Sequence, residues 1–121
     1  ELLHRMERND AILFAVPSYW GDVPAQFKAL IDRCTPYADT NPLPGHSRPA
    51  AGKRVFAAAL RAGGRTGECE HLLQCVEHWS GHMGAEYDGG VMLTRVDGKE
   101  DLTLEQEVSV KSAVNAWISK K

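Results

Sequence analysis

The sequence predicts an α/β fold in which a parallel sheet carries helices on both faces. Two apolar runs, residues 11–16 and 55–60, are each followed by an amphipathic helical pattern, and a third strand and helix follow in the same order. Strands that alternate with helices usually pair in parallel, because each helix crosses a face of the sheet before the next strand begins. The 121 residues suffice for one domain, which we expect to span 1–121.

The first strand and helix lie on either side of Pro17. Residues 11–16 form a continuous apolar run, which is typical of a strand buried on both faces. Pro24 favours a helix start, since a first turn does not need its missing N–H. The apolar positions that share one face of this helix are Val23, Phe27, Leu30 and Ile31. Upstream, Leu2, Leu3 and Met6 indicate the end of another amphipathic helix.

The second and third units repeat this order after a long loop. Residues 35–52 hold four of the six prolines and predict that loop. A strand at 55–60 precedes a helix that Gly84 ends, and a third strand at 87–94 is broken by Gly89 and Gly90. Thr103 and Gln106 form a capping box for the last helix. Its apolar stripe is Val110, Ala113, Val114, Trp117 and Ile118.

Composition excludes several classes of protein. The formal charge of −2 and the absence of a basic stripe argue against nucleic-acid binding. No apolar run is long enough to span a membrane. Cys34, Cys69 and Cys75 have no CxxC spacing and are read as reduced thiols, which indicates a cytoplasmic protein.

Two loops follow the carboxyl ends of predicted strands, where open α/β sheets bind ligands. The first is 17–22 and includes Tyr19 and Trp20, which can stack on a planar ring. The second is 62–67, in which glycines allow close backbone approach. From composition alone, a plain strand-to-helix turn explains the first loop as well as a ligand site does, and explains the glycine-rich loop somewhat better.

The stretch from residue 10 to residue 33 closely resembles the NADPH-dependent FMN reductase family of flavodoxin-like proteins, which includes iron–sulfur flavoproteins and quinone reductases. The shared motif is an apolar strand, then Pro17-Ser18-Tyr19-Trp20-Gly21, then a helix with Gln26, Lys28, Asp32 and Arg33. Other parts of the chain are similar to the family too: Gly52-Lys53, Gly63-Gly64, the helix start at 67–70, Trp79 and His82-Met83-Gly84. The resemblance spans nearly the whole chain.

This resemblance implies a flavodoxin-like three-layer α/β/α fold and an FMN-dependent NAD(P)H oxidoreductase. FMN would be the cofactor and NAD(P)H the co-substrate, with a flavin, quinone or similar small molecule as acceptor. The residues that would contact FMN are Pro17, Ser18, Tyr19, Trp20, Gly21, Ala62, Gly63, Gly64, Arg65 and Gly67. Hydride transfer needs proximity more than a side-chain acid or base, so we predict no catalytic residue. A homodimer or homotetramer is expected.

The chain departs from the family at its start. The family's first strand and its Ser/Thr/Asn-rich phosphate loop have no match here, so we expect the fold to lack the first strand or strands and the main anion site. Residues 11–16 would then form an exposed apolar edge. The alternative function is therefore a truncated flavodoxin-like module without FMN that acts in protein–protein interaction.

Residues of the types that bind metals recur along the predicted helix that Gly84 ends. His71, Cys75, His78 and His82 recur at helical spacing. One helix cannot easily surround a tetrahedral ion, so we predict no metal and interpret the stripe as solvated or partner-facing.

Overall fold

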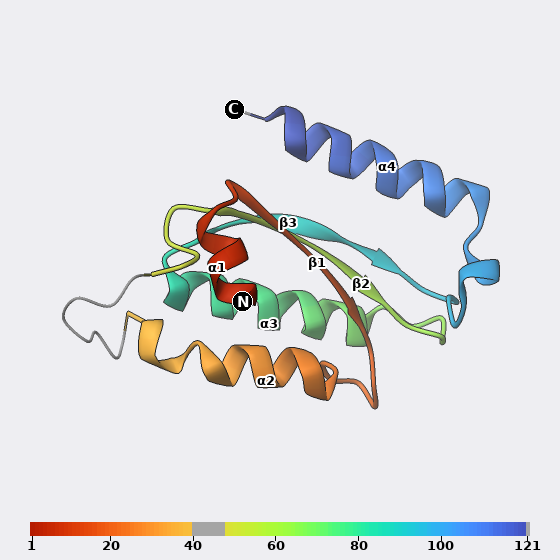
Figure 1. The fold of residues 1–121 in the computed structure, drawn as a ribbon. Coiled ribbons are helices and arrows are strands. Elements are labelled where there is room, and N and C mark those ends of the chain that lie inside the picture. Colours follow the sequence, from red (N-terminus) through yellow and green to blue (C-terminus); the bar gives the residue numbers. More distant parts are fainter. Residues whose placement is uncertain (40–47, 121) are drawn as a thin grey trace.

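The structure, a computed structural model, describes residues 1–39 and 48–120 (Figure 1). The strands are β1 (Ala11–Pro17), β2 (Arg54–Leu60) and β3 (Glu86–Leu93), and the helices are α1 (Leu2–Glu7), α2 (Ala25–Arg33), α3 (Gly67–Met83) and α4 (Leu104–Ser119). Short 3-10 turns cover Thr35–Tyr37 and Lys99–Asp101. None of the described helices has both the length and the apolar composition that a membrane span requires.

The three strands form one parallel sheet in the order β1-β2-β3. Helices α2 and α3 cover one face of this sheet, and α4 lies on the other (Figure 1). The predicted α/β fold with helices on both faces is confirmed. Its elements begin and end within one or two residues of the predicted positions, because the apolar runs and their turn residues mark the boundaries clearly.

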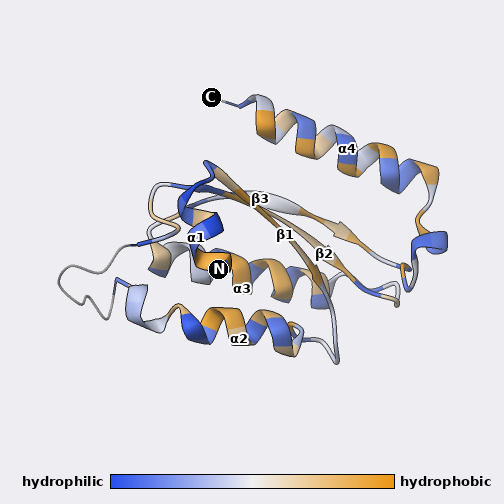
Figure 2. Cartoon of the chain, in the orientation of Figure 1, coloured by the Kyte–Doolittle hydropathy of each residue, from blue (hydrophilic) through white to orange (hydrophobic). Residues whose placement is uncertain are grey.

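The main core lies between the sheet and α3, where Figure 2 shows apolar residues concentrated. Val16 and Val55 from the strands pack with Leu72, Val76 and Met83 from α3, and all five are at most 1% exposed. Phe14 adds edge-to-face ring contacts to Phe27 of α2 and Trp79 of α3, with centroids 5.2 and 5.3 Å apart. Gly84 ends α3 in the left-handed conformation, at φ 70°, as predicted.

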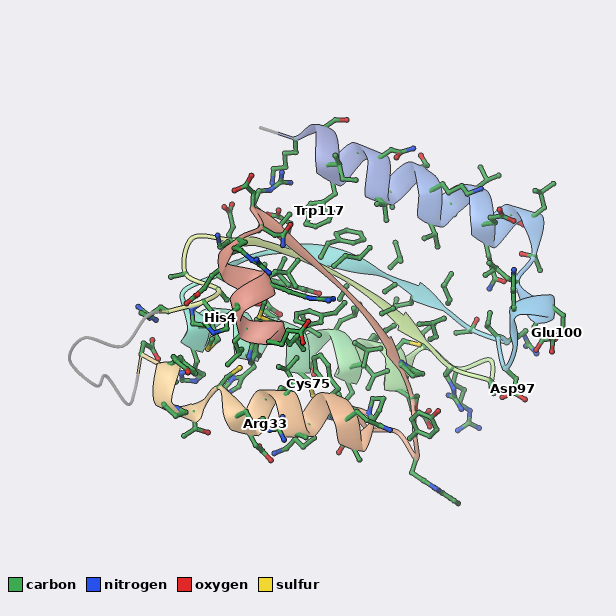
Figure 3. The ribbon with its side chains drawn as sticks, in the orientation of Figure 1. His4, Arg33, Cys75, Asp97, Glu100 and Trp117 are labelled. Carbon is green, nitrogen blue, oxygen red and sulfur yellow. The ribbon has the colours of Figure 1, made fainter. Side chains whose placement is uncertain are left out.

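On the other face, α4 contacts the sheet mainly through Trp117. Figure 3 shows this side chain directed from α4 toward the strands, and its ring stacks on Phe56 at 5.3 Å. The predicted capping box at Thr103 and Gln106 is present. The predicted apolar stripe is only partly buried, however, because Ile118 is 65% exposed and Trp117 is the one described residue of α4 that is buried.

Two expectations about the strands are corrected. Strand β1 is not buried on both faces: Ile12 and Val16 are covered by helices, whereas Leu13 on the opposite face is 50% exposed. Gly89 and Gly90 do not break β3 either. The strand continues through them with a register shift opposite residues 55–57, and Gly89 takes φ 100°, as a bulge position allows for glycine.

Candidate functional site

The loops that follow the three strands meet at one edge of the sheet. Pro17 pairs with Leu60, and the Ser18 N–H donates to the Leu60 carbonyl at 2.7 Å. The Arg61 N–H in turn donates to the Leu93 carbonyl at 3.0 Å. Backbone pairing therefore places the two predicted loops side by side, with the segment after β3 next to the second.

The first loop is a tight turn that exposes two aromatic rings. Tyr19 and Asp22 exchange backbone hydrogen bonds of 2.9 and 3.1 Å. Between them, Trp20 and Gly21 both have positive φ, at 56° and 77°, as in a type I′ turn. This conformation is strained for tryptophan. The turn leaves Tyr19 61% exposed and Trp20 fully exposed, so both rings are free to stack on a planar ligand.

The second loop presents backbone rather than side chains. The Gly63 carbonyl accepts the Arg95 N–H at 3.0 Å, and Arg61 Nη1 donates to the Arg65 carbonyl at 2.9 Å. Within residues 1–39 and 48–120, the N–H groups of Ala62, Gly63 and Gly64 have no hydrogen-bond partner. Side chains at the two glycines would collide with the guanidinium groups of Arg61 and Arg95. Three unpaired donors thus line an edge that a heterocycle can approach.

Glu68, in the first turn of α3, joins the two loops. Its Oε2 accepts a hydrogen bond from Ser18 Oγ at 2.8 Å and lies 3.3 Å from Arg61 Nε. Our sequence interpretation missed Glu68, Arg61 and Arg95. An acidic residue at a helix start is a detectable signal, but only the fold shows that this carboxylate points at the β1 loop.

All ten residues predicted to contact FMN belong to this edge. Pro17 ends β1, Ser18 follows it, and Tyr19, Trp20 and Gly21 lie in the tight turn; residues 62–65 follow β2, and Gly67 begins α3. Contact with a flavin stays a prediction for each of them. The structure supports it through exposed aromatic rings and unpaired N–H groups, which fit a planar heterocycle.

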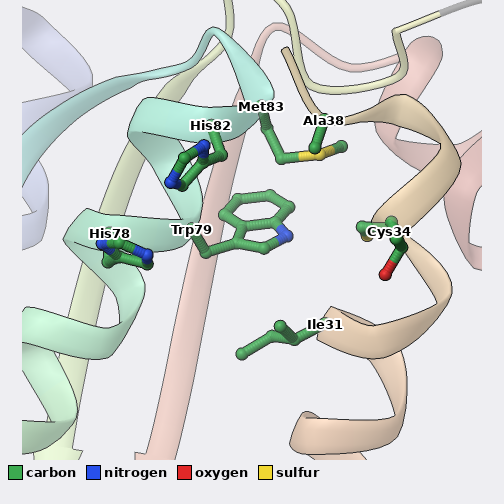
Figure 4. Close-up of a pocket in the computed structure, with 8 residues that line it drawn as sticks. Ile31, Cys34, Ala38, His78, Trp79, His82 and Met83 are labelled. Atoms are coloured by element: carbon green, nitrogen blue, oxygen red, sulfur yellow. The ribbon is translucent and has the colours of Figure 1, made fainter. Parts of the chain in front are cut away.

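A separate hollow of about 260 Å³ lies between α2 and α3, away from this edge (Figure 4). Trp79 forms its floor, and the buried Nε1 of that indole has no hydrogen-bond acceptor among the described residues. Burial raises the pKa of the nearby Cys34 thiol. This apolar hollow is not at the carboxyl end of the strands, where open α/β sheets bind ligands.

The histidine stripe divides into two groups. The rings of His78 and His82 meet edge-to-face with centroids 4.7 Å apart, and His82 Nδ1 lies 2.9 Å from an Asp39 carboxylate oxygen. Near the start of α3, His71 Nε2 lies 3.7 Å from Cys75 Sγ. Burial raises the pKa of the Cys75 thiol, and the charge of Asp22 raises it further.

Residues 1–95 match the family described as NADPH-dependent FMN reductase. The chain belongs to this family. An iron–sulfur flavoprotein from Methanosarcina thermophila is 36% identical over 80 residues, which are 65% of this chain and 38% of the relative. The chain therefore matches well under half the length of that relative.

Solved structures agree on the fold. The NADPH-quinone reductase from P. pentosaceus superposes with a TM-score of 0.68 at 16% identity, over 99% of this chain and 73% of that one. The general stress protein 14 from Treponema denticola, solved in complex with FMN, gives 0.64 at 18% identity, over 96% and 68%. The Trp repressor binding protein from Bacillus subtilis gives 0.68 at 23% identity, over 93% and 65%. The fold of this family member is flavodoxin-like.

Proposed function

We propose that the protein is an FMN-dependent oxidoreductase that takes electrons from NAD(P)H and passes them to a small acceptor such as a flavin or quinone. The observation that carries the proposal is the carboxyl edge of the sheet. There, the loop after β1 exposes Tyr19 and Trp20. The neighbouring loop after β2 has three unpaired N–H groups. Family membership and an FMN complex among structures of the same fold support this assignment.

Each loop has a distinct role in this proposal. The aromatic rings of the first loop would pack along the isoalloxazine. The N–H groups of Ala62, Gly63 and Gly64 would donate to its heteroatoms, in the way that backbone amides commonly orient a flavin. Glu68 holds the two loops at a fixed separation, which limits the reorganisation that binding requires.

Bound FMN would supply the redox chemistry that links NAD(P)H to the acceptor. The protein's part is to hold the ring and leave one face open for NAD(P)H. No proton-transfer group is required of the chain, in keeping with the expectation of no catalytic residue. A cytoplasmic homo-oligomer remains part of the proposal.

Titration of the purified protein with FMN tests the proposal. We expect flavin fluorescence to be quenched at one equivalent, and the bound flavin's visible absorbance to bleach when NAD(P)H is added without oxygen. Trp20→Ala should raise the FMN Kd by about tenfold, because it removes a stacking surface. If the protein itself carries no flavin after excess FMN has been added and the unbound FMN removed, the proposal is overturned. That outcome would favour the alternative role in protein–protein interaction.

Leu104→Ala is the matched control for this substitution. Leu104 is a large apolar side chain that is 76% exposed and lies at the start of α4, outside the two loops. We expect it to leave FMN binding unchanged. If both variants weakened FMN binding equally, the loss would come from removing any exposed apolar side chain and not from the loop after β1.

A further inference from the structure

Three side chains of different chemistry converge at the start of the groove between α2 and α3. They are Asp22 from the loop after β1 and His71 and Cys75 from α3. Their carboxylate oxygen, imidazole nitrogen and thiol sulfur all lie within 4.8 Å of one another. Figure 3 shows Cys75 on the side of α3 that faces α2.

Two of the three distances between ligand atoms are close to those of a tetrahedral metal site. Asp22 Oδ1 lies 3.6 Å from His71 Nε2, and that nitrogen lies 3.7 Å from Cys75 Sγ. Ligands bound to one tetrahedral Zn²⁺ at ordinary bond lengths are roughly 3.3 to 3.6 Å apart. Only small side-chain rotations would therefore bring the three atoms around one ion.

We propose that Asp22, His71 and Cys75 form a binding site for a divalent transition metal of the Zn²⁺ class. One oxygen, one nitrogen and one sulfur ligand suit a borderline ion, whereas Mg²⁺ and Ca²⁺ require mainly oxygen. Metal binding displaces the thiol proton of Cys75 to solvent, after which the thiolate and the Asp22 carboxylate together neutralise the ion's two charges.

The surroundings favour this occupant. The three residues line a hollow of about 400 Å³, which leaves room for a water or another ligand in a fourth position. The Val23 N–H donates to Asp22 Oδ1 at 2.7 Å, which orients the carboxylate. Lys28 is the cation in the same hollow, but its ammonium pairs with Asp32 on its own helix.

This proposal goes beyond flavin binding and departs from the expectation of no metal. Helical spacing revealed only ligands from one helix. The third ligand, Asp22, comes from a loop 49 positions before His71 in the sequence, and the fold alone places it opposite that helix.

Titration with Co²⁺ tests the site, because a cobalt–thiolate bond gives a near-ultraviolet charge-transfer band. Chelator-treated protein should bind one equivalent and develop this band, and Zn²⁺ should abolish it. Difference spectra recorded before and after Zn²⁺ cancel any flavin absorbance. Cys75→Ser should lose the band, and His71→Gln and Asp22→Asn should each weaken binding by about tenfold or more.

His82→Gln is the matched control, since His82 belongs to the same stripe but pairs with Asp39. It should bind Co²⁺ as the unaltered protein does. Absence of one-equivalent binding, a thiolate band that persists in Cys75→Ser, or equal loss in His82→Gln and His71→Gln would overturn the proposal.

Thiol alkylation keeps the test decisive if a variant does not fold. In the unaltered protein, Zn²⁺ should slow the alkylation of Cys75, as read by peptide mass spectrometry. Cys34 and Cys69 are buried and serve as internal references. Equal alkylation of Cys75 with and without Zn²⁺ would contradict a metal–thiolate bond.

Discussion

Glu68 shows how one side chain can organise a site that it need not touch. Its carboxylate accepts the Ser18 hydroxyl and pairs with Arg61, so it connects residues that follow two different strands. The carboxylate also lies at the start of α3, where the helix dipole favours a negative charge. We interpret Glu68 as a positioning residue for the two loops.

Glu68→Gln should therefore weaken FMN binding more than it destabilises the fold. The amide keeps the shape but loses the ion pair to Arg61, which is partly exposed and contributes little to global stability. We expect the FMN Kd to rise about three- to tenfold, with a nearly unchanged melting temperature. Glu70→Gln, two residues further along α3, is the control. A parallel fall in melting temperature would point to a structural role instead.

At the scale of elements, a buried ion pair fastens α4 to the sheet. The Arg54 guanidinium donates to Asp88 Oδ2 at 2.8 Å and to the carbonyls of Trp117 and Lys120 at 2.6 and 2.7 Å. Trp117 Nε1 donates to the same Asp88 oxygen at 2.8 Å. Burial works to raise the pKa of Asp88, but these hydrogen bonds and the charges of Lys120 and Arg54 lower it overall.

The lowered pKa of Asp88 predicts loss of stability in acid. A carboxyl whose folded pKa is depressed contributes fully above its unfolded value of about 3.9 and loses that contribution as pH falls through the folded pKa. Asp88→Asn should cost about 2 to 4 kcal/mol at pH 7, since it leaves the largely buried Arg54 guanidinium without its charge partner. Its unfolding free energy should also fall less than that of the unaltered protein below about pH 4.

Urea unfolding between pH 3 and 7 would measure both effects. Lys111→Ala, which removes an exposed pair on α4, is the control and should behave like the unaltered protein. The same slope in acid for Asp88→Asn and the unaltered protein would contradict the role of this carboxylate.

Two glycines predict opposite effects of the same substitution. A methyl group at Gly90 would collide with the Ala57 carbonyl and lie 2.7 Å from Leu73 Cδ2. The backbone would have to move to relieve the contact with the carbonyl. At Gly81, inside α3, a methyl group meets nothing within 4 Å. Gly90→Ala should lower the free energy of unfolding by about 1 to 3 kcal/mol, and Gly81→Ala should raise it by roughly 0.5 to 1. Thermal unfolding of the two variants side by side checks both signs.

At the scale of the whole molecule, β1 is an open edge. Among the described residues it pairs with β2 on one side and with no strand on the other. Leu13 and Ala15 are exposed on the face of the sheet that carries α4, at the edge that this helix does not cover. An apolar edge of this kind favours pairing with another chain.

Leu13→Lys should reduce self-association, because a charge on the edge strand opposes strand pairing. We expect light scattering at high protein concentration to show a smaller mean mass than for the unaltered protein. Ile118→Lys, which adds the same charge at a 65% exposed apolar position on α4, is the control. Association that only the control disrupts would place the contact on α4.

The sequence by itself determined the fold class, the alternation of elements and the two loops at the carboxyl edge. These features follow from local rules: apolar periodicity, helix caps at Thr103 and Gly84, and the prolines that mark a strand end at Pro17 and a helix start at Pro24. The family motif in residues 10–33 carried the flavin hypothesis. Two local signals misled: the apolar run of residues 11–16 predicted burial on both faces of β1, and Gly89-Gly90 predicted a break, whereas pairing to β2 sustains the third strand through a bulge.

Only the tertiary structure decided which residues meet across the molecule. Glu68 reaches the β1 loop, Asp88 binds Arg54 and Trp117, and Asp22 faces His71 and Cys75. The physical reason is that side-chain chemistry is local in sequence, whereas hydrogen bonds and metal geometry depend on distances that sheet pairing and helix packing set. No spacing along the chain encodes a separation of a few ångströms between residues that lie dozens of positions apart.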